Sequence, residues 1–518
     1  MVLNRNVLLP AAVFCILSTT ACWSNIWFVN SAFNAYYSLL VGSLLLCPFA
    51  ISRRKQNGSL VSPVWVSCGI YAVYVILHGF VFEKENYYWM GTLAAFLLLS
   101  AMHQPLRNTS DRSFLLNLIL WLSIAECFVC LLQWIGVVKS LSPYFISTGT
   151  FENPNYSAII VAFCFPIVIE RICNGKHIVP YCLVGILFLL SLAVLLCRTA
   201  ILIVFVCLLI KLYLWGRNKL GSRNKIAFGI LALIFCIGVL TGLYKAKEKS
   251  SEGRIFIARQ TINLVAEKSA WGVGYGLFEK EFNLYQSEII QSGKCTSEER
   301  KNIRWVFTAY NEFLEQLAQG GIAGLSFFLL FAGSFCLVAF RSHSYISVCF
   351  ALSIVIEMFF NFWQQAYPIF TVSLLMIGYI MAEDKKGIQM SGKAIILRYF
   401  LIWVSVILVG CHTLATLPGQ VRLASLGKTS NNAVLQETVE KLEALKPYIG
   451  TSSNYYTMLG YSYLRQRKQA KAKAVFLDAG HFTSAPDIYL GLYYCYKLEK
   501  DEVKAEECKK YLESIHAK

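Results

Sequence analysis

The chain has 518 residues, of which 56% are hydrophobic and 15% charged, and its mean hydropathy is +0.53. Soluble globular proteins carry about 25% charged residues. The composition therefore excludes a soluble enzyme and indicates a protein that crosses a membrane several times. The formal net charge of +17 follows from basic residues in short loops between apolar runs, so it does not require a nucleic acid as partner.

Apolar runs long enough to cross a bilayer as helices, about 17–25 residues each, follow one another through residues 1–413. They predict an all-α, polytopic membrane bundle of about 12–13 spans. The first run could instead be a signal peptide. Cys22 after Thr20 and Ala21 suggests a lipoprotein site, but Thr19 stands where such a site has a leucine. The runs lie at about 8–28, 35–52, 63–82, 88–103, 113–137, 156–172, 178–197, 199–215, 226–244, 321–340, 344–361, 367–382 and 394–413.

Every cluster of basic residues in the short loops falls on one side of the membrane if the N-terminus lies in the cytoplasm, whereas the opposite loops carry few or mixed charges, such as Lys84 between two glutamates and Lys139 alone. The positive-inside rule assigns that side to the cytoplasm. A large loop at about 245–320 and everything from residue 414 to 518 are then predicted to lie outside. The basic residues are Arg5, Arg53, Arg54, Lys55, Arg107, Arg112, Arg171, Lys176, Arg217, Lys219, Arg223, Lys225, Arg341, Lys385, Lys386 and Lys393.

Arg198 interrupts an apolar stretch that runs from Val179 to Tyr213. An arginine at membrane depth costs at least a few kcal/mol, about 2.5 or more, so it is normally kept to bind an anion or a counter-ion. The alternative is that Arg198 only marks the junction of two spans. The predicted orientation places it at the outer face.

The large outer loop contains a helix-like segment followed by three glycines. Arg254 lies near the start of the segment, and Ile255, Ile257, Ala258, Ile262 and Val265 are predicted to form its apolar face. The turn that follows contains Gly272, Gly274 and Gly276. Its Gly-x-Gly-x-Gly pattern lacks a preceding strand, so it is weak evidence for a nucleotide site.

Four segments in this order resemble the O-antigen ligase and polymerase superfamily. They are TGTFENPNYSA at 148–158, Arg198, the Gly-Arg pair at 253–254 with WGVGYGLF at 271–278, and YNEFLEQLAQGGIAGL at 310–325. The resemblance covers about residues 110–380. It implies a metal-independent enzyme without a cofactor in a bacterial inner membrane. The expected reaction moves a glycan from undecaprenyl diphosphate to an acceptor on the periplasmic face.

The resemblance maps the two diphosphate-binding arginines of the family onto Arg198 and Arg254. Arginine suits that role because its planar donors match phosphate oxygens. Where the family usually has a histidine that activates the acceptor, this chain has Tyr310, so the catalytic base is open. Glu312 is the alternative, and His78 and His412 come next.

Further candidate substrate contacts are three asparagines and a lysine. The side chains of Asn153, Asn155 and Asn311 can bond sugar hydroxyls, and Lys245 can attract the anionic head group of the donor. The segment 361–368 contains Trp363, Gln364, Gln365 and Tyr367. Its composition is typical of an aromatic belt at the membrane surface or of a sugar-binding surface.

The tail at 414–518 is charged and predicted to be helical. It repeats the order Leu-Gly-x-x-Tyr at 459–463 and 490–494, which is typical of a tetratricopeptide-like repeat of about 34 residues. Such a module binds a protein partner or its own membrane domain. Cys295, Cys495 and Cys508 lie on the outer side, where a disulfide could form. The remaining cysteines show no metal-ligand spacing.

The sequence leaves the acceptor open. A ligase would use lipid A-core as acceptor, and a polymerase would use a growing glycan. A protein O-oligosaccharyltransferase would use a protein hydroxyl. The ligase is the first prediction, with the protein O-oligosaccharyltransferase next because of the tail. A transporter of lipid-linked sugar or another anion is a further alternative, although matched broken spans in two halves, typical of transporters, are not seen.

Overall fold

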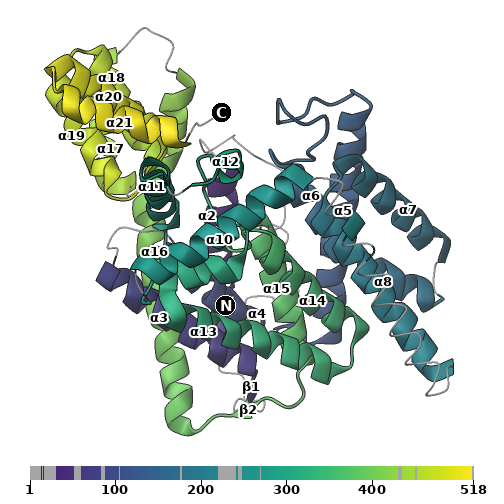
Figure 1. Ribbon diagram of the computed structural model, residues 1–518. Coiled ribbons are helices and arrows are strands. Elements are labelled where there is room, and N and C mark those ends of the chain that lie inside the picture. Colours follow the sequence, from purple (N-terminus) through teal and green to yellow (C-terminus); the bar gives the residue numbers. More distant parts are fainter. Residues whose placement is uncertain are drawn as a thin grey trace.

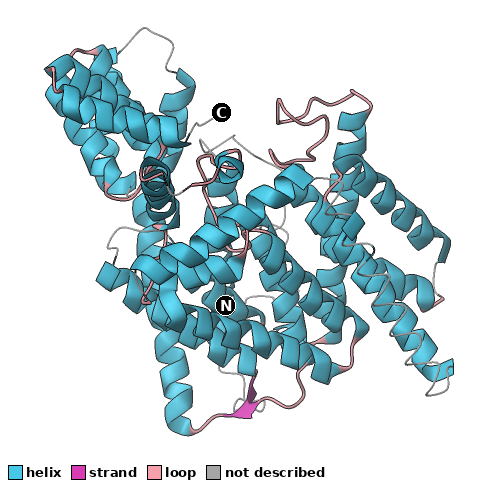
Figure 2. Cartoon of the chain, viewed as in Figure 1, coloured by secondary structure: helices cyan, strands magenta, loops and turns pink. Residues whose placement is uncertain are grey.

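The computed structural model is almost entirely helical (Figures 1 and 2). It describes residues 31–51, 60–82, 88–103, 105–175, 178–219, 248–268, 270–293, 295–429, 435–449 and 452–515, with isolated positions at 13, 16, 238 and 241–242.

Seven helices in this part of the chain are long and apolar enough to cross a membrane, and four more are apolar but shorter. These eleven coincide with predicted spans, whereas the spans predicted at 8–28 and 226–244 lie largely outside the described residues. The long helices are α3 (Pro63–Phe82), α5 (Thr109–Trp134), α6 (Pro154–Cys173), α7 (Ile178–Leu195), α8 (Arg198–Lys219), α13 (Glu312–Ser342) and α16 (Gly392–Thr429). The shorter ones are α2 (Ser31–Ile51), α4 (Tyr88–Met102), α14 (Tyr345–Phe360) and α15 (Tyr367–Glu383).

Burial differs between central and peripheral helices. Nearly every residue of α4 and α15 is buried, and 67% of the apolar window of α6 is buried, against 22% for α7 and for α16. Helices that are apolar all round but poorly buried by protein are suited to a lipid surface. The bundle therefore has a protein core with α7 and α16 at its margin.

A short 3-10 helix, η1 (Pro105–Arg107), and two strands lie outside the apolar helices. Strand β1 (Leu60–Val61) pairs antiparallel with β2 (Ile388–Gln389) at the end of the bundle drawn at the bottom of Figure 1. This pair joins two loops with basic residues on the predicted cytoplasmic side. It is the only strand pairing among the described residues.

The large loop that is predicted to lie outside folds around an apolar core of its own. It contains α10 (Glu248–Lys268), α11 (Phe278–Gln291) and α12 (Ser297–Arg300). The predicted apolar face of α10 was wrong in part, because the side chains of Ile255 and Ile262 are 50% and 51% exposed. The buried face is rotated toward Phe256, Ile257 and Leu264, which pack against α11 and the chain before α13.

The tail forms five helices, α17 (Leu435–Ile449), α18 (Ser453–Arg465), α19 (Gln469–Gly480), α20 (Pro486–Glu499) and α21 (Glu502–Ile515). The ring of Phe476 is wedged between two glycines, since a Cβ at Gly460 or Gly491 would lie 2.5 or 2.3 Å from it. The small residues of the repeated motif thus allow close helix packing. The tetratricopeptide-like assignment stays a prediction, as does the boundary at 414, which α16 crosses without a break to Thr429.

The tail packs against α11 at the end of the bundle opposite β1 and β2 (Figure 1). If the basic loops are cytoplasmic, we expect alkaline phosphatase fused after Lys518 to be active and green fluorescent protein exported there by the general pathway to be dark. A fusion placed in the loop before α14 serves as the control of opposite orientation. Bright fluorescence after Lys518 would contradict the predicted topology.

Candidate functional site

Arg198 is the first residue of α8 and follows a sharp turn after α7 in which Leu196 has a φ of 49°. Its side chain is half-buried and reaches the outer loop, where Nη1 donates a hydrogen bond of 2.6 Å to Ser251 Oγ on α10. Helix N-termini carry partial positive charge and free N–H groups that favour anions. Arg198 therefore both marks the junction of two spans and extends toward the loop.

Arg254 lies on α10, one turn beyond Ser251. Its Nη1 donates a hydrogen bond of 2.5 Å to the Phe360 carbonyl at the end of α14, and its guanidinium lies 5.1 Å from the centroid of the Tyr310 ring. Burial and then the positive charge of Arg198 lower the pKa of Arg254. The two arginines predicted from the sequence are thus brought together by α8, α10 and α14.

Tyr310 holds a left-handed backbone, with a φ of 53°, immediately before α13. Its ring packs edge-on against Phe362 at 5.7 Å. Asn311 caps α13 by accepting a hydrogen bond of 3.0 Å from Leu314 N, and its amide donates to the Phe359 carbonyl at 3.0 Å. The fold therefore uses both polar ends of Asn311, whose predicted contact with substrate stays a prediction.

Glu357 is a residue of this site that the sequence analysis missed. It is fully buried near the end of α14, and its Oε2 accepts a hydrogen bond of 2.9 Å from Asn361 Nδ2. Its Oε1 has no hydrogen-bond partner among the described residues. The same Asn361 amide lies 3.5 Å from Thr199 Oγ1, beside Arg198. A single acidic residue in the apolar span 345–360 was the signal that could have identified it.

Glu312 belongs to a separate, buried polar network. Its Oε1 accepts a hydrogen bond of 2.9 Å from Gln316 Nε2, and its Oε2 accepts one of 3.0 Å from the backbone N–H of Gln364. Only 1% of the residue is exposed. The neighbouring Glu315 accepts from Ala309 N at 2.6 Å and from Thr308 Oγ1 at 2.9 Å, so it holds the segment before Tyr310.

Asn153 caps α6 by accepting a hydrogen bond of 3.0 Å from Asn155 N, and both asparagines are half-buried. The next residue on α6, Tyr156, packs edge-on at 6.3 Å against Phe362, the ring that also contacts Tyr310. The start of α6 therefore borders the arginine site. Lys245 lies outside the described residues, so its predicted role has no structural counterpart here.

The predicted aromatic belt or sugar-binding surface at 361–368 was wrong. Trp363 is fully buried, with its ring 4.7 Å from that of Phe370, and Gln364 is 6% exposed in the Glu312 network. The two further histidine candidates face other partners. His78 lies 2.9 Å from the Trp271 carbonyl and His412 lies 2.9 Å from Tyr36 Oη.

The glycine turn packs against a kink in α13 rather than presenting its backbone to a nucleotide. Val273 N and Gly274 N donate to the carbonyls of Ala318 and Gln319 at 2.8 and 3.0 Å. Gly321 breaks α13 with a φ of 66°, and a Cβ there would lie 2.3 Å from the Ala270 carbonyl. The glycines thus allow the outer loop to approach the membrane helix closely.

Gly272→Ala is expected to lower the free energy of unfolding by more than about 1 kcal/mol. A Cβ at this position would lie 2.3 Å from the Gln319 carbonyl, and the φ of 86° disfavours any side chain. Thermal unfolding of the purified protein measures the change. Gly293→Ala is the matched control, because Gly293 has a φ of 71° but no atom within 4 Å of its Cβ position. Equal losses for the two variants would show that the contact with α13 contributes nothing.

Cys295, Cys495 and Cys508 are free thiols in the structure, and the latter two are buried in the tail. Within the described ranges no three side chains of His, Cys, Asp or Glu lie close enough together to hold a metal ion.

The helices and this site define a polytopic membrane protein with two converging arginines on the face that carries the large loop. Residues 183–329 match the model of a protein family described as O-Antigen ligase. This match covers the part of the chain that contains Arg198, Arg254 and Tyr310, and it supports the resemblance to the O-antigen ligase superfamily. It includes neither Asn153 and Asn155 nor the tail. A search of curated proteins gave no match.

Proposed function

We propose that this protein transfers a glycan from undecaprenyl diphosphate to an acceptor hydroxyl at the periplasmic face of a bacterial inner membrane. The observation that carries the proposal is the convergence of Arg198 and Arg254 from α8 and α10. Arg198 donates a hydrogen bond to Ser251, one turn before Arg254 on α10, and Arg254 donates to the end of α14, the helix that carries the carboxylate of Glu357. These three side chains therefore keep an excess of positive charge that suits a diphosphate.

In the proposed reaction, the bond between the anomeric carbon and the diphosphate oxygen breaks, and its electron pair stays on the leaving diphosphate. The acceptor oxygen forms the new bond to the anomeric carbon and loses its proton. Fixed guanidinium groups stabilise the negative charge that develops on the leaving group. The proton passes to a base, for which Tyr310 occupies the position of the family histidine and Glu312 is the alternative.

The acceptor distinguishes the ligase from its relatives. We favour a ligase that joins the glycan to lipid A-core, with protein O-oligosaccharyltransferase and polysaccharide polymerase as the alternatives. The folded tail beside the outer loop favours a protein acceptor among the alternatives, because helical repeats of the proposed kind bind proteins. Membrane lipids surround the donor, and the tail is the surface for any protein partner.

Deletion of the gene tests the proposal. Loss of the whole capped lipopolysaccharide ladder supports the ligase, loss of long chains alone supports the polymerase, and loss of glycan mass from proteins supports the oligosaccharyltransferase. Complementation with the intact gene and with the Arg254→Ala variant distinguishes loss of catalysis from an effect of the deletion on the expression of neighbouring genes. Unchanged lipopolysaccharide and unchanged glycoproteins would contradict the proposal.

A further inference from the structure

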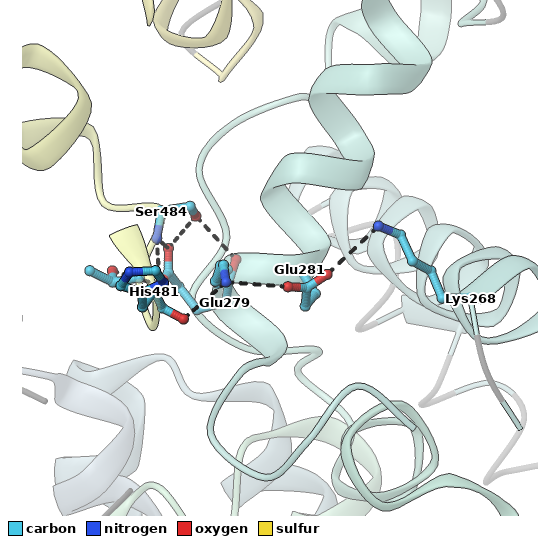
Figure 3. Close-up of polar contacts among 7 residues, drawn as sticks. Lys268, Glu279, Glu281, His481 and Ser484 are labelled. Carbon is cyan, nitrogen blue, oxygen red and sulfur yellow. Dashed lines mark hydrogen bonds and ion pairs between the residues drawn. The ribbon is translucent and has the colours of Figure 1, made fainter. Parts of the chain in front are cut away.

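Three separate segments of the chain meet at the side chain of Glu279 on α11, and Figure 3 shows its contact with Ser484 of the tail. The residue is 8% exposed. Its carboxylate accepts hydrogen bonds from the tail and from the segment that leads to Tyr310. A buried carboxylate is stable only when such partners satisfy it.

The tail contributes donors from the turn between α19 and α20. Thr483 Oγ1 donates to Glu279 Oε2 at 2.8 Å, and Ser484 Oγ donates to Oε1 at 2.6 Å. The Ser484 N–H lies 3.2 and 3.3 Å from the two oxygens. Lys280 Nζ also donates to the His481 carbonyl at 2.9 Å. The tail is therefore fastened to α11 by charge-assisted hydrogen bonds.

The same carboxylate holds the chain that precedes Tyr310. Trp305 Nε1 donates to Glu279 Oε1 at 2.8 Å. One turn further along α11, Asn283 pairs with both backbone groups of Val306, at 2.9 and 2.8 Å. Helix α11 thus fixes residues 305–306, four residues before Tyr310.

The backbone of Tyr310 depends on such support. A left-handed φ at a bulky residue costs about 1–3 kcal/mol and persists only where the surroundings over-determine it. Glu315 holds Thr308 and Ala309 from the side of α13, while α11 holds residues 305–306 from the other side. A shift of α11 would therefore move one of the two supports of Tyr310.

We propose that Glu279 is a positioning residue through which the tail keeps Tyr310 in place for transfer, an inference that rests on the proposed function. The tail is then part of the catalytic machinery, in addition to any binding of a partner. Arg198 and Arg254 lie on α8 and α10, and Arg254 meets Tyr310 through a contact with its ring. We therefore expect the tail to affect the chemical step more than the binding of the donor.

The test uses the full chain in lipid nanodiscs with the variants Glu279→Ala, Glu279→Gln and the tail double variant Thr483→Ala with Ser484→Ala. Glutamine keeps an acceptor for Trp305, so it should retain turnover within about threefold. The alanine and tail variants should lower kcat about tenfold and leave the KM for the lipid-linked donor within about twofold, because displaced reacting groups slow the chemical step. Amide hydrogen exchange at residues 303–310 should become about tenfold faster in the same variants.

Glu281→Gln is the matched control on the same helix. Its carboxylate pairs at 3.7 Å with Lys268 and Lys280 and makes no hydrogen bond to the tail among the described residues (Figure 3). Unchanged exchange in the tail variant would overturn the inference, as would faster exchange with unchanged kcat. If the wild-type protein transfers no glycan, the proposed function fails, and exchange still decides whether the tail holds residues 303–310.

Discussion

Arg254→Ala and Arg198→Ala are each expected to lower glycan transfer at least about a hundredfold while the protein remains in the membrane, a loss of roughly 2.7 kcal/mol in transition-state stabilisation. Each variant removes one guanidinium from the pair that meets between α8 and α10. The remaining arginine cannot neutralise both phosphates of the leaving group. Single-turnover transfer from purified lipid-linked donor measures the effect.

Lysine at either position should rescue transfer only in part, because it keeps the charge but loses the planar set of donors. Arg259→Ala is the matched control, since Arg259 lies on the same helix with its side chain 66% exposed and pairs at 3.7 Å with Glu299. A rate within about threefold of wild type, worth about 0.7 kcal/mol, for either alanine variant would show that the arginine concerned is structural.

Tyr310→Phe is expected to lower turnover about a hundredfold, the usual minimum contribution of a general base, while the donor still binds. The substitution removes only the hydroxyl, and the ring keeps its contacts with Arg254 and Phe362. Tyr310→His should retain activity. Histidine tolerates a left-handed backbone better than most residues, and imidazole titrates near neutral pH. Donor affinity and single-turnover rate, measured separately, distinguish binding from chemistry.

Two carboxylate variants test the rival bases. Glu312→Gln should act mainly on stability, because both oxygens of Glu312 already accept hydrogen bonds inside the protein. Glu357→Gln examines the carboxylate beside the arginines. If Tyr310→Phe leaves the transfer rate unchanged and either Glu357→Gln or Glu312→Gln abolishes transfer, the carboxylate that was replaced is the base.

Much of the fold could be predicted because the apolar composition and length of a segment are enough to predict a membrane-spanning helix. A helix in lipid must satisfy every backbone group internally, so apolar length determines the element. Which face of α10 is buried could not be predicted in the same way. Helix α10 lies outside the bundle, and its neighbours α11 and the chain before α13 determine which face is covered.

The arginines were accessible from the sequence because a permanent charge in an apolar run is conspicuous. Glu357 was equally conspicuous in the span 345–360, but its proximity to Arg254 depends on how α14 packs between α8 and α13. Glu279 gave no signal, since an acidic residue on a helix outside the membrane is ordinarily solvated. Its burial follows from contact with Thr483 and Ser484, far away along the chain.

The length of α16 determines how far the tail lies from the predicted last span. Its 38 residues extend about 57 Å at 1.5 Å per residue, against a hydrocarbon core of about 30 Å. The helix therefore connects the last span directly to the tail, and Pro418 lies within the connecting part. One residue inserted above the membrane would turn the tail by about 100° and carry Ser484 away from α11, whereas a whole extra turn would restore the direction and change only the height.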